Sequence, residues 1–266
     1  MWPSRRNSRA LHHKTVPVAA ADGAPPSPCS STRSQLPTPA SSMARPRFPD
    51  LRNNDDYDEV VALGFDLSPE NLLEAYRNGI FPWPRFNLSM VWASPVMRGL
   101  LMFDELRVPR SLRQQRRRST WRYSVDESFE QVIRACADAI RPDGYGTWIT
   151  PGIVAAYDRF HHLGHAHSVE VWDGDELVGG LYGVEVDGVF AGESMFHRKP
   201  NASKLALLHL IDILRKAGAE WLDIQTLTPH IALLGGREVP RKTFLHMLDE
   251  ARSRGLTPFA PFRGET

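Results

Sequence analysis

The stretch LDIQT carries a carboxylate and an amide inside an apolar setting. In a strand, successive side chains point to opposite faces, so Asp223 and Gln225 share one face. Leu222 and Ile224 then point to the other face, into the core. Buried polar groups need hydrogen-bond partners, which leaves two interpretations open. Asp223 belongs to a site, or it caps a neighbouring helix or satisfies a loop.

The stretch GESMFHRKPNASK places a second carboxylate, Glu193, within an apolar run. The glycine before it permits close approach of another backbone or of a ligand. Strand alternation predicts that Met195 shares the face of Glu193, whereas Ser194 and Phe196 take the other face.

Glu193 also has two interpretations. A carboxylate in this setting can accept hydrogen bonds from a cationic amine, and burial would perturb its ionisation. The alternative is a simple ion pair with Arg198 or Lys204. Asn201 is expected to cap the helix that follows, whose free N-terminal amides suit a phosphate beside Arg198 and Lys199.

Arginines crowd one segment although the net charge is only +1, from Lys+Arg 32 and Asp+Glu 31. The segment RVPRSLRQQRRRSTWR, residues 107–122, contains no acidic residue. Such a run is often merely solvated, but its cations repel one another unless a polyanion is near. We therefore predict phosphate binding there.

Other kinds of site are not supported. In HHLGHAH, Gly164 separates His161 from His165 and breaks the helical register of a metal pair, so no metal is expected. Cys29 and Cys136 are far apart and have no C-x-x-C companion. The sequence has no P-loop, dinucleotide fingerprint or G-x-S-x-G elbow, and no apolar run near the roughly 18 residues of a membrane span. We expect no membrane partner and a reducing compartment.

The elements that must position these residues follow from periodicity and end signals. Three strands of an antiparallel meander are predicted over residues 166–196, separated by DGD and DG turns. Buried strands are predicted in RGLLMFDEL and WLDIQTL, and a packed loop over residues 80–95. Helices are predicted over 67–79, 126–139, 150–164, 202–218 and 240–253, and within the arginine segment. This order indicates an α+β protein with a mainly antiparallel sheet covered by helices.

The first fifty residues differ from the rest because they mix Pro, Ser, Ala and Arg with almost no acid. We expect residues 1–50 to be a disordered extension, residues 51–100 a small N-terminal domain and residues 101–266 a catalytic domain. The extension is either a targeting segment or lies upstream of a true start at Met43, which we favour.

Several long motifs carry a family resemblance that spacing alone could not supply. They are LLEAYRNGIFPWP, VWASP, GTWITPGIVAAYDRFHHLGHAHSVEVW, GESMFHRKPNASKLAL and LDIQTLTPHIALLGGREVPRKTF. Together, from about residue 63 to 262, they resemble the leucyl/phenylalanyl-tRNA–protein transferases. Local departures are His197, where the family usually has serine, and Ile224, where cysteine is frequent.

The resemblance implies transfer of leucine or phenylalanine, and less readily methionine, from Leu-tRNA or Phe-tRNA to proteins with an N-terminal Arg or Lys. The product would carry an N-end rule degradation signal. The implied catalytic domain is similar to the acetyltransferase-like (GNAT) fold. Because aminoacyl-tRNA is already an activated ester, no ATP, CoA or metal cofactor is expected. A monomer in the cytoplasm is expected.

The resemblance also implies residue roles. The catalytic set matches Asp223, Gln225 and Glu193. Asp223 and Gln225 would form a proton relay, and Glu193 would hold the substrate amino acid or its amine. The implied substrate-binding residues are Tyr76, Trp83, Trp148, Tyr157, Ser194, Met195 and Phe196, and Tyr76 would stack on the terminal adenine. The basic residues expected to contact tRNA are Arg113, Arg116, Arg117, Arg118, Arg198, Lys199 and Lys204.

Two rival functions remain. An acyl-CoA-dependent acetyltransferase would need the glycine-rich pyrophosphate loop, which the sequence lacks. An RNA-binding module would explain the arginines, but it would not require Asp223, Gln225 and Glu193.

Overall fold

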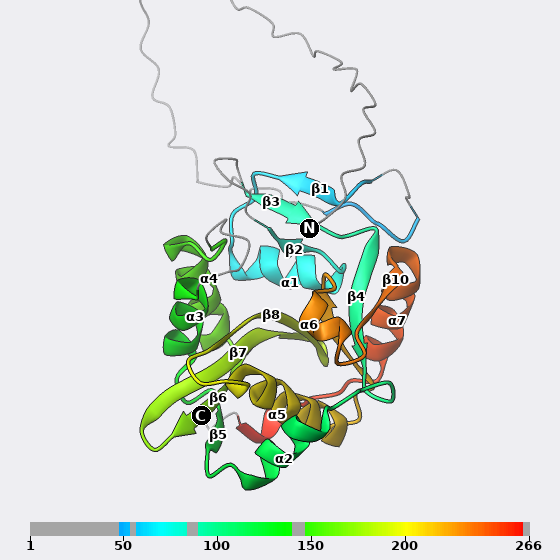
Figure 1. Ribbon diagram of the computed structural model, residues 1–266. Coiled ribbons are helices and arrows are strands. Elements are labelled where there is room, and N and C mark those ends of the chain that lie inside the picture. The colour runs from blue at the N-terminus through cyan, green and yellow to red at the C-terminus, as the bar shows by residue number, and fades with distance from the viewer. Residues whose placement is uncertain (1–47, 54–56, 84–89, 140–146, 263–266) are drawn as a thin grey trace, which may run out of the picture. The chain divides into compact units, whose positions relative to one another are not determined.

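The architecture is an α+β arrangement, described by a computed structural model for residues 48–53, 57–83, 90–139 and 147–262 (Figure 1). The predicted disorder of the N-terminal extension falls almost wholly outside these residues. The described residues belong to one compact unit. The division at about residue 100 into two domains stays a prediction.

A seven-stranded sheet has the order β10-β4-β9-β8-β7-β6-β5. All neighbours are antiparallel except β8 and β9, which run parallel with Ala191 beside Asp223. The strands are β4 (Met97–Met102), β5 (Arg122–Val125), β6 (Ala166–Asp173), β7 (Glu176–Val186), β8 (Val189–His197), β9 (Trp221–Gln225) and β10 (Arg237–Pro240). The predicted meander, β6 to β8, is therefore confirmed.

Helices cover both faces of this sheet (Figure 1). One face packs against α1 (Pro69–Arg77), α3 (Phe129–Asp138), α4 (Pro151–His162) and α7 (Arg241–Ser253). The other packs against α2 (Arg110–Arg118), α5 (Ala202–Lys216) and the short α6 (Pro229–Ala232). A single turn, η1 (Ala260–Phe262), follows near the C-terminus. We call the two faces of the seven-stranded sheet the α1/α4 face and the α5 face.

Local signals explain why the helices form where they do. Pro69 opens α1, and Thr150 caps α4 by accepting a hydrogen bond from the Ile153 amide at 3.3 Å. Helix α5 is apolar along most of its length, which fits its burial beneath the sheet. The predicted helices are confirmed to within a few residues.

The predicted packed loop at 80–95 is wrong in part. Phe81–Pro82 and Val91–Ala93 form short strands, β2 and β3, which pair with β1 (Val60–Leu63) in a three-stranded sheet of order β1-β3-β2. Proline disfavours a central strand, but Pro82 lies on an edge strand, where its missing N–H is tolerated. Within the described residues, no helix is long and apolar enough to cross a membrane.

Candidate active site

Four elements, β8, β9, α1 and α4, bring a carboxylate, an amide and two phenols together on the α1/α4 face. Glu193 Oε1 accepts hydrogen bonds from the Tyr76 hydroxyl at 2.7 Å and from Gln225 Nε2 at 2.6 Å. The Tyr76 and Tyr157 hydroxyls lie 2.6 Å apart. Strands β8 and β9 run parallel, and Ala191 lies beside Asp223. Glu193 and Gln225 each lie two residues further along their strands, so they also come to lie side by side.

A β-bulge sets the direction of the Glu193 side chain. Tyr182 pairs with Ser194 and Gly183 with Gly192, which leaves Glu193 as the extra residue of β8. The prediction that Glu193 and Met195 share a face is therefore wrong. Glu193 bonds residues of the α1/α4 face, whereas Met195 packs into the core of the α5 face.

Asp223 lies on the same face but is bonded differently. Arg98 donates to it twice, from Nε to Oδ1 at 2.8 Å and from Nη2 to Oδ2 at 2.6 Å. The side chains are 1% and 4% exposed, so this is a buried ion pair. The Arg98 guanidinium also lies between the rings of Phe81 and Phe244, at 4.8 and 4.5 Å from their centroids.

Arg98 also connects this cluster to the end of α1. Its Nη1 donates to the Gly79 carbonyl at 3.1 Å. Gly79 has a φ of 69°, and a Cβ there would lie 2.7 Å from the Phe244 ring, so both conformation and space demand glycine. The helix that carries Tyr76 is thereby anchored to the residue that holds Asp223.

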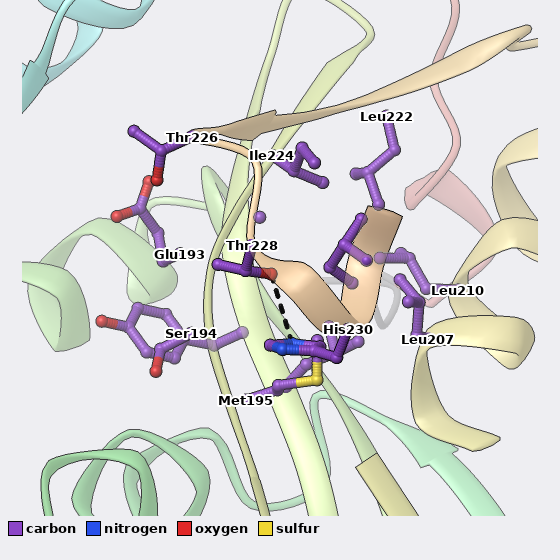
Figure 2. Close-up of a pocket in the computed structure, with 14 residues that line it drawn as sticks. Glu193, Ser194, Met195, Leu207, Leu210, Leu222, Ile224, Thr226, Thr228 and His230 are labelled. Carbon is purple, nitrogen blue, oxygen red and sulfur yellow. Dashed lines mark hydrogen bonds between the residues drawn. The ribbon is translucent and has the colours of Figure 1, made fainter. Parts of the chain in front are cut away.

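An apolar pocket of about 190 Å³ opens where β8 and β9 continue beyond their paired residues. Glu193 lies at one end, and Leu207 and Leu210 of α5 lie at the other (Figure 2). The lining residues are Leu181, Tyr182, Gly192, Glu193, Ser194, Met195, Leu207, Leu210, Leu222, Ile224, Thr226, Thr228, His230 and Ile231. The pocket therefore joins an acid–base group to a wall suited to an aliphatic or aromatic side chain.

Burial dominates the ionisation of this cluster. It raises the pKa of Glu193 to about 7, aided by repulsion from Asp223 and opposed by the hydrogen bonds from Tyr76 and Gln225. Burial and the neighbouring Glu193 charge raise the pKa of both Tyr76 and Tyr157 well above the usual value. Glu193 therefore titrates near neutral pH, while the phenols stay protonated.

Not all predicted substrate contacts line the pocket. Ser194 and Met195 do, and Tyr157 reaches the cluster through Tyr76. Trp83, Trp148 and Phe196 pack instead in or against the core of the α1/α4 face, so the structure does not bring them to this pocket.

Tyr76 itself is only 7% exposed, and its ring stacks near that of Phe160 at 6.5 Å between centroids. An adenine would require a more accessible ring, because stacking needs a free aromatic face. The adenine contact of Tyr76 stays a prediction.

The predicted tRNA-binding residues fall into two groups. Arg113, Arg117 and Arg118 are exposed on α2, whereas Arg116 pairs with Asp212 of α5. The second group, Arg198, Lys199 and Lys204, lies near the start of α5, and some of these residues already interact with other groups of the protein. Lys199 pairs with Asp173 and Glu176, Arg198 donates to the Leu177 carbonyl, and Lys204 lies close enough to His230 to lower its pKa, after the larger effect of burial.

Sequence reasoning missed two contributors. Arg98 lies in the predicted buried strand RGLLMFDEL, where the sequence analysis gives it no role. An arginine in an apolar run nevertheless indicates a buried partner. The wall formed by Leu207, Leu210 and Ile231 was also missed, because each lies on a helix whose apolar face would be expected to enter a core. Among the described residues, no group of three or more His, Cys, Asp or Glu could hold a metal.

This arrangement defines an enzyme site in which a titrating carboxylate adjoins a pocket for a small apolar group. Sequence comparison agrees. The family model described as "Leucyl/phenylalanyl-tRNA protein transferase" matches residues 100–249, and that of the family's N-terminal domain matches residues 65–96. The chain belongs to the leucyl/phenylalanyl-tRNA–protein transferase family and is an aminoacyltransferase.

Individual relatives are similar over most of their length. The chain is 50% identical to the leucyl/phenylalanyl-tRNA–protein transferase of Anaeromyxobacter dehalogenans (strain 2CP-C) over 206 residues, 77% of this chain and 88% of the relative. It is 49% identical to that of Syntrophobacter fumaroxidans over 193 residues, 73% and 82% respectively. The solved structure of L-PGS from Bacillus licheniformis aligns with a TM-score of 0.34 at 12% identity, over 61% of this chain and 55% of that one.

Proposed function

We propose that the enzyme moves leucine or phenylalanine, and less readily methionine, from aminoacyl-tRNA to the N-terminal Arg or Lys of acceptor proteins. The product carries an N-end rule degradation signal. The observation that carries this proposal is that Glu193, which accepts a hydrogen bond from Gln225, lines the apolar pocket between β8 and β9. The α-amine of the acceptor attacks the ester carbonyl there, while the apolar wall holds the side chain of the donor amino acid.

Glu193, Gln225 and Asp223 form the proposed catalytic cluster. Gln225 already donates to Glu193, and its amide dipole lies where it can polarise a carbonyl or orient the amine. The exposed arginines of α2 hold the acceptor stem through its phosphates, without reading sequence. We further propose a GNAT-like catalytic domain preceded by a small N-terminal domain, acting as a cytoplasmic monomer without ATP, CoA or a metal.

A transfer assay tests this function. Purified protein is mixed with leucyl-tRNA carrying labelled leucine and with a peptide that begins with Arg. We expect a peptide heavier by one leucine, measured by mass spectrometry. The same peptide with an acetylated N-terminus, and a peptide beginning with Met, serve as controls. Absence of product with the Arg peptide, or equal product with the acetylated one, would refute the proposed function.

A further inference from the structure

The two carboxylates of the site are in opposite bonding states. Both oxygens of Asp223 are bonded to Arg98, and Oδ1 also accepts from the Gln225 backbone amide at 2.9 Å. A carboxylate held this way is satisfied and screened from a substrate by its own partner. Of the three residues Glu193, Gln225 and Asp223, Glu193 alone is among the described residues that line the pocket.

Glu193 has one oxygen bonded and one not. Oε1 accepts from Tyr76 and Gln225, whereas Oε2 is buried without a hydrogen-bond partner among the described residues. The Glu193 residue as a whole keeps partial exposure and lines the pocket. A buried polar atom without a partner is costly, and at an active site it marks a place where a substrate group completes the bonding.

The Arg98–Asp223 pair has a different effect, which acts on the backbone of β9. Gln225 has a φ of 60°, a left-handed conformation that is uncommon for a residue other than glycine. Asp223 stabilises it by the turn in which its side chain accepts from the amide two residues on. This conformation directs Gln225 Nε2 to Glu193.

We propose that Glu193, through Oε2, takes the proton from the α-amine of the acceptor, and that Arg98 and Asp223 are positioning residues that act through Gln225. The inference rests on the proposed function and assigns two separate roles within its catalytic cluster, proton transfer and positioning. The amine nitrogen bonds to the ester carbonyl carbon, and the bond from that carbon to the ribose 3′ oxygen breaks. The proton released by the nitrogen goes to Oε2 and then to the leaving ribose oxygen.

The electrostatic surroundings of Glu193 suit this role. A pKa of about 7 lies close to the roughly 7.7–8.0 of an α-amine, so the proton transfer is nearly balanced. The titratable and charged groups around Glu193 come from every side of the site. Tyr76 of α1, Tyr157 of α4, Arg98 of β4 and Asp223 of β9 interact with Glu193 directly, and Tyr182 of β7 and His230 of α6 line the same pocket.

The test is the pH profile of single-turnover leucine transfer at saturating Arg peptide, from pH 5.5 to 9. Since the base must be deprotonated, the wild-type rate should rise with pH through about 7 and then level off. Glu193→Gln keeps an oxygen for Tyr76 and Gln225 but removes the base. We expect about a 100- to 10,000-fold slower rate. The rise of the rate near pH 7 should be lost, and the remaining pH dependence should reflect only the ionisation of the acceptor α-amine.

Asp223→Asn separates positioning from proton transfer. We expect a slower reaction that keeps a rise with pH, because Glu193 is still present. The midpoint of that rise should move to a lower pH, because the repulsion from Asp223 that helps to raise the pKa of Glu193 is lost. Asp223→Asn leaves the Arg98 guanidinium buried opposite a neutral group, so Arg98→Met/Asp223→Asn is a second, charge-balanced variant. Urea unfolding and tRNA binding report whether each variant is folded.

Two outcomes overturn the inference. One is a rise near pH 7 that survives in Glu193→Gln. The other is the loss of any such rise, at pH 7 or below, in both variants that carry Asp223→Asn, which would assign the proton to Asp223. Wild-type protein that transfers no leucine at any pH would instead refute the proposed function itself, so the two failures are distinguishable.

Discussion

Charged side chains lie in two very different settings, the interior at β4, β8 and β9 and the outer surface of α2. Arg98 is 1% exposed and bonds Asp223, the Gly79 carbonyl and two aromatic rings. Arg113, Arg117 and Arg118 have the same chemistry but lie exposed on a helix that contains no acidic residue.

This difference shows how environment decides what a charge can do. In the interior, a charge interacts strongly with one partner in a fixed geometry, and removing either leaves the other uncompensated. On the surface, each charge is weakly coupled and screened by salt, so only the sum of several charges matters to a polyanion. Interior charges therefore set the shape of the site, whereas the surface charges of α2 are the ones that we propose contribute to the affinity for tRNA.

The largest effect is expected for Arg98→Met, which leaves Asp223 buried without its partner. The free energy of unfolding at pH 7 should fall by about 3–5 kcal/mol, measured by urea denaturation. Arg134→Met is the matched control, because Arg134 is 62% exposed and forms an ion pair with Glu130 on the same helix. That variant should lose about 0.5 kcal/mol or less. Similar losses for the two would show that burial of Arg98 has no special effect.

The second effect concerns stability against pH. A carboxyl whose pKa rises from 4.5 to about 7 on folding favours the folded state fully below pH 4.5, and this contribution is lost as pH rises through 7. The loss is up to roughly 3 kcal/mol, since one pKa unit corresponds to about 1.4 kcal/mol.

Glu193→Gln should remove this dependence, so the variant gains stability relative to wild type between pH 5 and 8. Urea unfolding of both proteins at several pH values measures the difference. Parallel stability curves would contradict the raised pKa of Glu193.

The smallest effect on stability is expected for the surface. Replacing Arg113, Arg117 and Arg118 together with Gln should change the free energy of unfolding by about 0.5 kcal/mol or less per site. Binding to tRNA should nevertheless weaken, and the slope of log affinity against log salt should become shallower by about 2–3. Arg134→Gln on α3 is the control for an exposed arginine elsewhere. An unchanged salt slope would remove α2 from the donor-binding surface.

Much of the fold could be predicted because its signals are local. The apolar period of α3, the Thr150 cap of α4 and the DG turn between β7 and β8 each act within a few residues. The short strands β2 and β3 could not, since their stability comes from pairing with one another and with β1 rather than from a pattern of their own.

For the site, the sequence by itself determined which residue types are available for chemistry and which of them are candidates. Glu193, Asp223 and Gln225 stand out because polar groups in apolar strands need partners, and the family motifs supply the reaction class. Spacing left open whether Glu193 forms an ion pair with Arg198 or Lys204, and the structure shows that its partners are Tyr76 and Gln225.

Only the tertiary structure decided how the two carboxylates differ. A β-bulge places Glu193 on the α1/α4 face, against strict alternation with Met195. Arg98, which is 125 residues away in sequence, donates hydrogen bonds to Asp223 and so occupies its carboxylate. Both depend on pairing register and on contacts distant in the chain, which no local pattern encodes. Residue types set the available chemistry, while packing and local dielectric decided which carboxylate keeps an oxygen that has no hydrogen-bond partner in the described part of the chain.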